Sequence, residues 1–183
     1  MTAAPALRLV DTSTATTYNF RGDRSTWARC TINDSTGELS IQSDWGNWAH
    51  SWHHHGCANV TEFIGGRNGG DYIAGKLLGR AGCTVFDLDA TVSEFRRQVL
   101  DERRQLEMDA ETARDIWEEL GDLDSDVDER GFVDEWMRTD PLRDYCSEPW
   151  EHLRHTPSRE YRALVDIILP ALIAECSKAA AHA

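Results

Sequence analysis

Short runs that alternate between apolar and polar positions dominate the first third of the chain. Five such runs are rich in β-branched and aromatic residues, a composition that favours strands with one buried face. They span residues 6–10, 16–20, 27–32, 38–43 and 45–54. Between the third and fourth runs, the sequence NDSTG is typical of a turn, because its glycine can adopt a positive φ. The pattern predicts an N-terminal antiparallel β-sheet of about five short strands within residues 1–58.

After residue 58 the apolar residues follow the period of amphipathic helices. Asn59 has the side chain of a helix cap, and Asp89 or Thr91 could cap a longer helix that carries Val92, Phe95, Val99 and Leu106 on one stripe. Pro170 is expected to kink or break the last helix. We therefore predict an α+β fold in a single domain, 1–183, with a β-rich part (1–58) and a mainly helical part (59–183).

Residues 43–56 hold three of the seven tryptophans and four of the seven histidines. Gly46 suggests a tight turn or a bulge there. Beyond Gly46, the period of a strand places four side chains on one face, those of Trp48, His50, Trp52 and His54. The three tryptophans of this segment, Trp45, Trp48 and Trp52, either pack across strands in a core or form an interaction surface, because tryptophan is favoured in both settings.

Three other tryptophans lie within apolar patterns, which predicts that they belong to the core. They are Trp27, Trp117 and Trp136.

Negative charge is concentrated in the middle of the chain. Residues 87–151 hold 22 acidic and 8 basic residues, a net charge of −14, whereas the rest holds 10 acidic and 11 basic residues. Such a surface repels nucleic acid and membranes and attracts basic protein surfaces. We therefore predict a protein partner with a basic surface, and neither direct nucleic-acid binding nor membrane binding. The predicted contact residues are Asp122, Asp124, Asp126, Asp128, Glu129, Asp134 and Glu135, together with Trp48 and Trp52.

Two sequence patterns deserve comparison with metal sites. The histidines between His50 and His55 are followed by Cys57, and these are suitable zinc ligands. Neighbouring strand residues point to opposite faces, however, so His53 and His54 do not converge easily on one ion. Residues 124–135 have an EF-hand-like spacing of carboxylates, but Glu129 occupies the position that requires glycine. We predict no cofactor, no metal and no calcium binding better than about millimolar.

Catalytic and targeting patterns are also missing from the sequence. The glycine-rich residues 65–70 lack the Lys-Ser/Thr ending of a P-loop, and no nucleophile motif occurs, so we assign no catalytic residue and predict a non-enzymatic protein. The five cysteines include no C-x-x-C pair, which argues against a disulfide framework. No apolar run approaches the ~20 residues of a spanning helix, and no secretory signal is visible. These features predict a cytoplasmic location.

Three segments, read in order, carry a resemblance. They are GELSIQSDWGNWAHSW at residues 37–52, DYIAGKL at residues 71–77 and VFD at residues 85–87. The order resembles an accessory protein family encoded by bacteriophages and prophages, over roughly residues 27–89. The resemblance implies a bacterial host cell as the setting and carries over no activity and no catalytic residues.

Three functions are compatible with these observations. The favoured hypothesis is a phage accessory protein that binds a host protein such as a nucleic-acid-handling defence complex, with its acidic helical surface as the contact and inhibition of that protein as a further expectation. The second hypothesis is a small metal-dependent enzyme or module that uses the histidine-rich strand end. The third is an assembly factor for phage particles.

Overall fold

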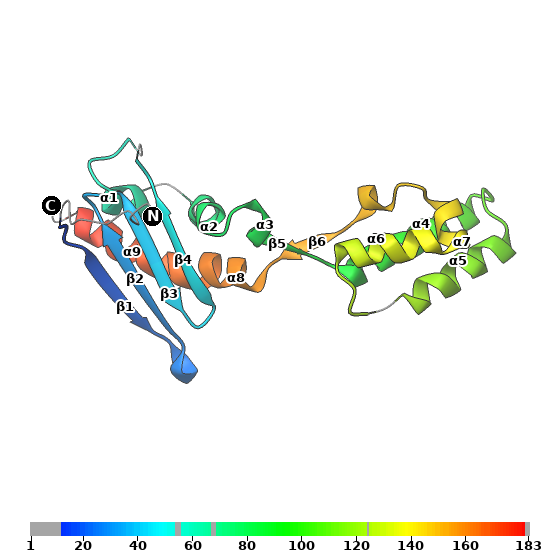
Figure 1. Ribbon diagram of the computed structural model, residues 1–183, viewed down its shortest axis with the longest axis horizontal. Helices are drawn as coiled ribbons and strands as arrows, with labels where there is room; N and C mark the ends of the chain where they lie inside the picture. Colours follow the sequence, from blue (N-terminus) through cyan, green and yellow to red (C-terminus); the bar gives the residue numbers. More distant parts are fainter. Residues whose placement is uncertain (1–11, 54–55, 67–68, 124, 182–183) are drawn as a thin grey trace, which may run out of the picture. The chain divides into compact units, whose positions relative to one another are not determined.

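The computed structural model describes residues 12–53, 56–66, 69–123 and 125–181, and Figure 1 shows its elements. Contacts within the chain gather in two compact units. The first unit joins Met1–Cys83 to Ser158–Ala183, and the second is the continuous segment Thr84–Pro157. The predicted α+β class is confirmed, since the strands of a four-stranded sheet come first and most helices follow. That residues 1–183 form a single domain stays a prediction, because it depends on whether the two units unfold together.

Four antiparallel strands form the sheet of the first unit, in the order β1-β2-β3-β4. Their bounds are Thr16–Arg21 (β1), Trp27–Asn33 (β2), Glu38–Ser43 (β3) and Gly46–Ser51 (β4). Cys30 lies opposite Ile41, and Ile41 lies opposite Trp48, so these three side chains point to the same face of the sheet. Along each strand every second side chain shares that face. Cys30 and Ile41 are fully buried on that face. The strand predicted at residues 6–10 lies outside the described residues.

The turn predicted at Gly46 is confirmed. Ser43 pairs with Gly46, so two residues join β3 to β4, and Gly46 has a φ of 150°. After this turn Trp48 and His50 share the inward face of β4, as the alternation predicts. His54, the last member of the predicted face, lies outside the described residues.

Helices cover the inward face of this sheet, as Figure 1 shows for α1 and α9. The helical elements of the unit are α1 (Val60–Gly65), α2 (Gly70–Leu78), α3 (Arg80–Cys83), α8 (Arg159–Arg162) and α9 (Leu169–Ala180), with a 3₁₀ turn η1 (Asp23–Ser25) and a π-helical segment η3 (Ala163–Ile168). The predicted cap of α1 is confirmed, because Oδ1 of Asn59 accepts a hydrogen bond from the amide of Glu62 at 2.8 Å. Gly65 lets α1 pack closely on α9, since a Cβ there would lie 2.8 Å from the backbone of Cys176.

Pro170 interrupts the last helix in a specific way. Its ring nitrogen carries no hydrogen, so one backbone bond of a regular α-helix is lost. The chain adopts the π-helical segment η3 just before it, and the amide of Leu169 bonds to the carbonyl of Leu164, five residues earlier. The predicted break is therefore a local widening of the helix. Ile168 is buried in the core, while its neighbour Ile167 is 53% exposed.

The second unit is mainly helical. Its elements are β5 (Thr84–Phe86), α4 (Leu88–Arg104), α5 (Ala110–Asp122), α6 (Glu129–Arg138), α7 (Asp140–Tyr145), a 3₁₀ turn η2 (Pro149–His152) and β6 (His155–Pro157). Strands β5 and β6 pair antiparallel, so the two ends of the unit lie side by side. Asp87 caps α4 through a 2.9 Å bond from the amide of Ala90, which corrects the prediction of Asp89 or Thr91.

Aromatic side chains fill the core of the second unit. Phe95, Phe132 and Trp136 are fully buried, and the rings of Phe95 and Trp136 are 4.2 Å apart. The Nε1–H group of Trp136 donates a 2.9 Å hydrogen bond to the carbonyl of Cys146, so the buried indole keeps a polar partner. The prediction that Trp136 belongs to the core is confirmed.

Three other apolar residues were predicted to be buried and are not. Trp27 and Trp117 are each 39% exposed. Trp27 lies on the outward face of β2, because its neighbour Ala28 points inward. Trp117 lies beside the buried stripe of α5 and packs under the guanidinium of Arg96 at 5.2 Å. Leu106 is 85% exposed, because α4 ends at Arg104 and Leu106 has a φ of 62°.

Candidate protein-binding surface

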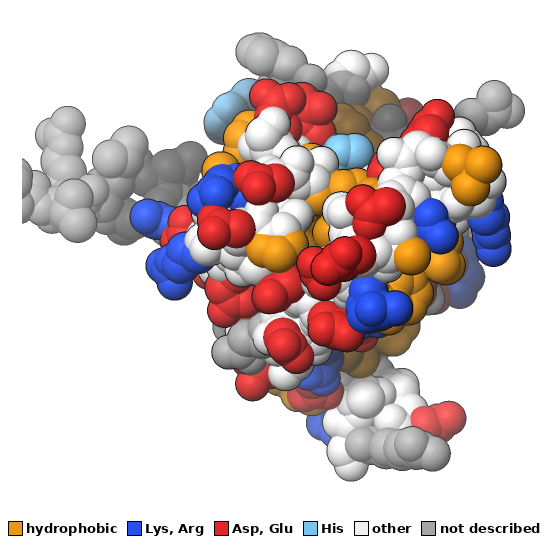
Figure 2. All heavy atoms as spheres, turned by 90° about the vertical axis from the view of Figure 1, so that its right-hand side faces the viewer, with side chains coloured by type: hydrophobic (Ala, Val, Ile, Leu, Met, Phe, Trp, Pro, Cys, Tyr) orange, Lys and Arg blue, Asp and Glu red, His pale blue; other side chains and the backbone are white. Residues whose placement is uncertain are grey.

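The boundary between the two units is also a boundary in charge. The second unit, Thr84–Pro157, holds 22 acidic and 9 basic residues, a net charge of −13. The first unit holds 10 of each and is therefore neutral. Figure 2 shows acidic side chains spread over the face formed by the helices of the second unit, among fewer basic ones. The whole net charge of the protein thus belongs to one folded unit.

Several of these carboxylates already make hydrogen bonds or ion pairs within the second unit. Asp87, Asp109 and Asp128 cap the three longest helices of the unit by accepting hydrogen bonds from backbone amides. Asp101 pairs with Arg97 and Arg104, each at 3.0 Å. Carboxylates held in this way are less available to a partner, because a contact would have to replace bonds that they already make.

Glu94 is the most strongly held of these groups. Its side chain is 17% exposed and lies 2.6 Å from Arg97 and 3.2 Å from Arg154. Hydrogen bonds from Arg97 and Gln98, with the charges of the two arginines, lower the pKa of Glu94 from 4.5 to about 2. Glu94 therefore joins α4 to the segment before β6 by charge.

We expect Glu94→Gln to destabilise the protein at pH 7 by about 1 kcal/mol, a value for a well-placed but solvent-screened charge network. Because the folded-state pKa is depressed, the stabilisation is complete above the usual pKa of 4.5 and is lost as the pH falls towards 2. Urea denaturation of both proteins at pH 7, 4 and 2.5 should show the difference shrinking. Glu107→Gln, at a residue without an ion pair in the described part of the chain, is the control. A pH-independent difference would contradict the assignment.

The contact residues predicted from the sequence are dispersed in the structure. Asp122 and Glu135 line one hollow of about 260 Å³, together with Glu119 and Arg138. Asp126 and Asp134 are exposed, and Asp124 lies outside the described residues. That these groups contact a partner stays a prediction.

Two of the predicted contact residues have structural roles of their own. Oδ1 of Asp128 accepts a 2.7 Å hydrogen bond from the amide of Gly131 at the start of α6. Glu129 lies 3.1 Å from Nε2 of His155.

Trp48 and Trp52 belong to the first unit. Trp52 is 6% exposed, and its ring contacts His50 at 4.5 Å and Phe63 at 5.6 Å between centroids. Trp48 is half-buried against the same core. The sequence left core packing and an interaction surface open as alternatives. The structure shows that Trp52 packs in the core. The partner contact predicted for the pair stays a prediction.

A line of carboxylates along α5 is the feature that the sequence reasoning missed. Glu111, Asp115, Glu118 and Asp122 recur at helical spacing and therefore share one face of the helix, over about 16 Å of its length. We call these four residues the α5 stripe. All four are exposed, and none has an ion pair among the described residues. Their i, i+4, i+7, i+11 spacing was the signal available in the sequence.

A wider hollow adjoins the stripe between α5 and α7. It measures about 550 Å³, and Asp115 and Glu107 line it with the apolar side chains of Ile116 and Tyr145. Asp140 also lines it, but Arg143 lies 2.6 Å from that carboxylate. A hollow lined by both carboxylates and apolar side chains suits the aliphatic stem and charged head of a lysine or arginine.

No described group of three or more His, Cys, Asp or Glu residues is arranged to hold a metal ion. His50 is half-buried, and burial lowers its pKa, with the charge of Lys76 acting in the same direction. His54 and His55 lie outside the described residues, so the histidine-rich end is only partly visible. The absence of calcium binding at residues 124–135 stays a prediction.

All five cysteines are free thiols, and Cys30 and Cys176 are fully buried. Burial raises the pKa of Cys30 to about 12 and that of Cys176 to about 11, so neither is a ready nucleophile. Among the described helices, none combines the length and the apolar character needed to cross a bilayer.

Comparison with known proteins identifies one relationship. No curated protein and no solved structure matches the chain. A phage family matches residues 10–178, which includes both units. The resemblance noted over residues 27–89 therefore extends over almost the whole sequence. The chain belongs to this phage family.

Proposed function

We propose that this phage protein is a non-enzymatic accessory protein that binds a host protein through its acidic helical unit and inhibits it. The observation that carries the proposal is the coincidence of charge and fold: Thr84–Pro157 holds the full net charge of −13, and the other unit is neutral. Like charges confined to one small unit oppose its folding, so stability does not explain them. Attraction of a partner with a basic surface explains why the charges are concentrated in one unit.

The α5 stripe gives this attraction a definite location. Its carboxylates lie one helical turn apart and face solvent, so they can approach a row of basic side chains without losing internal ion pairs. Proteins that handle nucleic acids carry such rows, because they neutralise phosphates with lysine and arginine. The stripe would therefore best suit a host protein that handles nucleic acids, for example one that belongs to a defence complex.

The partner can be sought with the tagged full chain as bait in phage-infected bacterial cells. The association rate of the purified pair is then measured at several salt concentrations. We expect that rate to fall as salt rises, because exposed charges are screened beyond ~8 Å at physiological ionic strength. A partner that is a virion structural protein would assign an assembly role instead.

Two variants with equal charge changes locate the contact. The first, Glu111→Gln, Asp115→Asn, Glu118→Gln and Asp122→Asn, neutralises the α5 stripe. The second neutralises four acidic residues of the first unit, Asp23, Glu38, Glu160 and Asp166.

We expect the stripe variant to associate at least about tenfold more slowly at low salt, within the range of electrostatic steering. The control should change by less than about twofold, because its charges lie outside the contact. Circular dichroism should show both variants folded. An association rate that changes neither with salt concentration nor with the four stripe substitutions would refute the acidic contact.

A further inference from the structure

One edge of the first strand, β1, has no neighbouring strand among the described residues. In the described part of the chain β1 pairs with β2 on one side and with no strand on the other. Its sequence, TTYNFR, contains no proline and only one charge, Arg21. Natural proteins usually protect such an edge with lysine, proline or a bulge, because its free amide and carbonyl groups invite another strand. The edge of β1 has none of these devices.

Aromatic side chains on β1 remain incompletely covered. Tyr18 and Phe20 point toward the core with their rings stacked 6.5 Å apart, yet both are only half-buried. Both belong to the layer of side chains that packs on the core. A further strand beside β1 would bury more of them.

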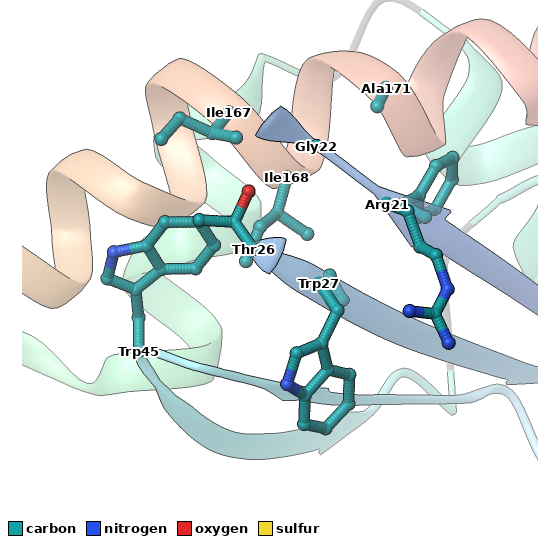
Figure 3. A pocket seen from close by; sticks show the side chains of 10 residues that line it. Arg21, Gly22, Thr26, Trp27, Trp45, Ile167, Ile168 and Ala171 are labelled. Carbon is teal, nitrogen blue, oxygen red and sulfur yellow. The ribbon is translucent and has the colours of Figure 1, made fainter. Parts of the chain in front are cut away.

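An apolar hollow lies at the end of the same strand. It measures about 180 Å³ and is lined by Phe20 and Gly22 on the β1 side and by Ile167 and Ala171 on the helical side. Figure 3 shows Ile167 and Ile168 on the helical side and Trp45 below Ile167 on the sheet side, while the Arg21 side chain extends away. Pockets for small-molecule ligands are usually ~300–1,000 Å³, so this hollow suits a single side chain of a neighbouring strand.

We infer that β1 is the contact between two copies of this chain, which pair antiparallel through this strand. Antiparallel neighbours share a face when they lie directly opposite. Placing Asn19 opposite Asn19 of the second copy sets Phe20 opposite its Tyr18, so the aromatic side chains of both copies lie on the covered face beside the hollow. Strand addition of this kind draws affinity from backbone hydrogen bonds and specificity from alternate side chains.

Electrostatics favour a second copy at this edge. In the register described, Arg21 lies opposite Thr17, so the only charges on the two strands do not meet. The edge belongs to the neutral unit, whereas two acidic units of −13 each would repel one another. Self-association of this chain therefore meets the least electrostatic repulsion when it occurs through the first unit. The inference is independent of the function proposed for the acidic unit.

The first test is the mass of the full chain in solution, by sedimentation velocity from 1 to 200 μM. We expect a monomer at low and a dimer at high concentration, because a contact of one strand pair is small and gives an affinity of about micromolar. Thr17→Lys with Asn19→Lys should weaken dimerisation at least tenfold, since these exposed positions then bring like charges together. Asn47→Lys with Ala49→Lys, on the outward face of β4, is the matched control and should dimerise like the parent.

The second test fixes the register. Asn19→Cys should form a disulfide-linked dimer under mild oxidation, because opposite Cα atoms in an antiparallel pair are about 4.5–5.5 Å apart, within disulfide reach. Asn47→Cys should cross-link at least tenfold more slowly. A chain that stays monomeric at 200 μM, or one whose dimer survives the β1 lysines, would overturn the inference. Protected β1 amides in a monomer would assign the edge to a different segment and would overturn it too.

Discussion

Trp136→Ala is expected to destabilise the second unit by about 3–5 kcal/mol, the usual cost of removing a large buried aromatic side chain. The indole is fully buried, with its ring 4.2 Å from Phe95 and 5.6 Å from Phe132. Its removal leaves a cavity and deprives the carbonyl of Cys146 of its donor. Because whole domains are stable by only about 5–15 kcal/mol, urea denaturation should show a much lower midpoint.

Trp117→Ala is the matched control, because this tryptophan is on a helix of the same unit and is 39% exposed. We expect it to cost about 1 kcal/mol or less, mainly through its contact with Arg96. Equal costs for the two substitutions would contradict the packing described for the second unit.

Hydrogen exchange of the Trp136→Ala protein also tests the domain organisation. Amides of the second unit should lose protection. If those of the first unit keep theirs, the units unfold separately; if they lose it together, residues 1–183 behave as the single domain that the sequence predicts.

Gly37→Ala is expected to cost about 2–5 kcal/mol through two effects. Gly37 has a φ of 69°, which costs an L-residue with a side chain about 1–2 kcal/mol. A Cβ at this position would also overlap the carbonyl oxygen of Trp52, and overpacking costs about 1–3 kcal/mol. The backbone cannot easily retreat, because the amide of Trp52 donates a 2.9 Å bond to the carbonyl of Gly37.

Gly56→Ala separates the two effects. Gly56 has a φ of 72°, but a Cβ there would meet no described atom within 4 Å. We expect only the backbone cost of about 1–2 kcal/mol at this position. Chemical denaturation of both variants gives the difference, and a cost at Gly56 as large as that at Gly37 would exclude the overlap with Trp52.

The sequence predicted the sheet well because its alternation is short-ranged and regular. The same alternation could have placed Trp27 outside, since Ala28, Cys30 and Ile32 already occupy the buried face of β2. The large apolar side chain of Trp27 favours burial, but its place in the alternation decides which face it occupies. Leu106 was misplaced for a different reason: a stripe on a helix says nothing about where the helix ends.

The division into two units was not visible in the composition. The few glycine, proline and serine residues near the boundaries, Gly79, Gly82, Pro157 and Ser158, form no long linker. The chain enters and leaves the second unit through the paired strands β5 and β6. The charge pattern came closest, with limits at residues 87 and 151 against Thr84 and Pro157 in the structure. The α5 stripe was missed because its members were counted as part of a charge total and not by their spacing on a helix.

The paired ends of the second unit have a genetic consequence. Thr84 lies opposite Pro157, and just beyond them the amide of Ser158 donates a 2.9 Å bond to the carbonyl of Cys83. Two cut points in the gene thus correspond to neighbouring points in the fold. A recombination event that replaces only the segment for residues 84–157 would preserve the four-stranded sheet and its β1 edge, and it would exchange the part of the protein that holds the entire net charge. If this unit binds the host protein as we propose, such an exchange would change the partner in one step and leave the rest of the molecule as it is.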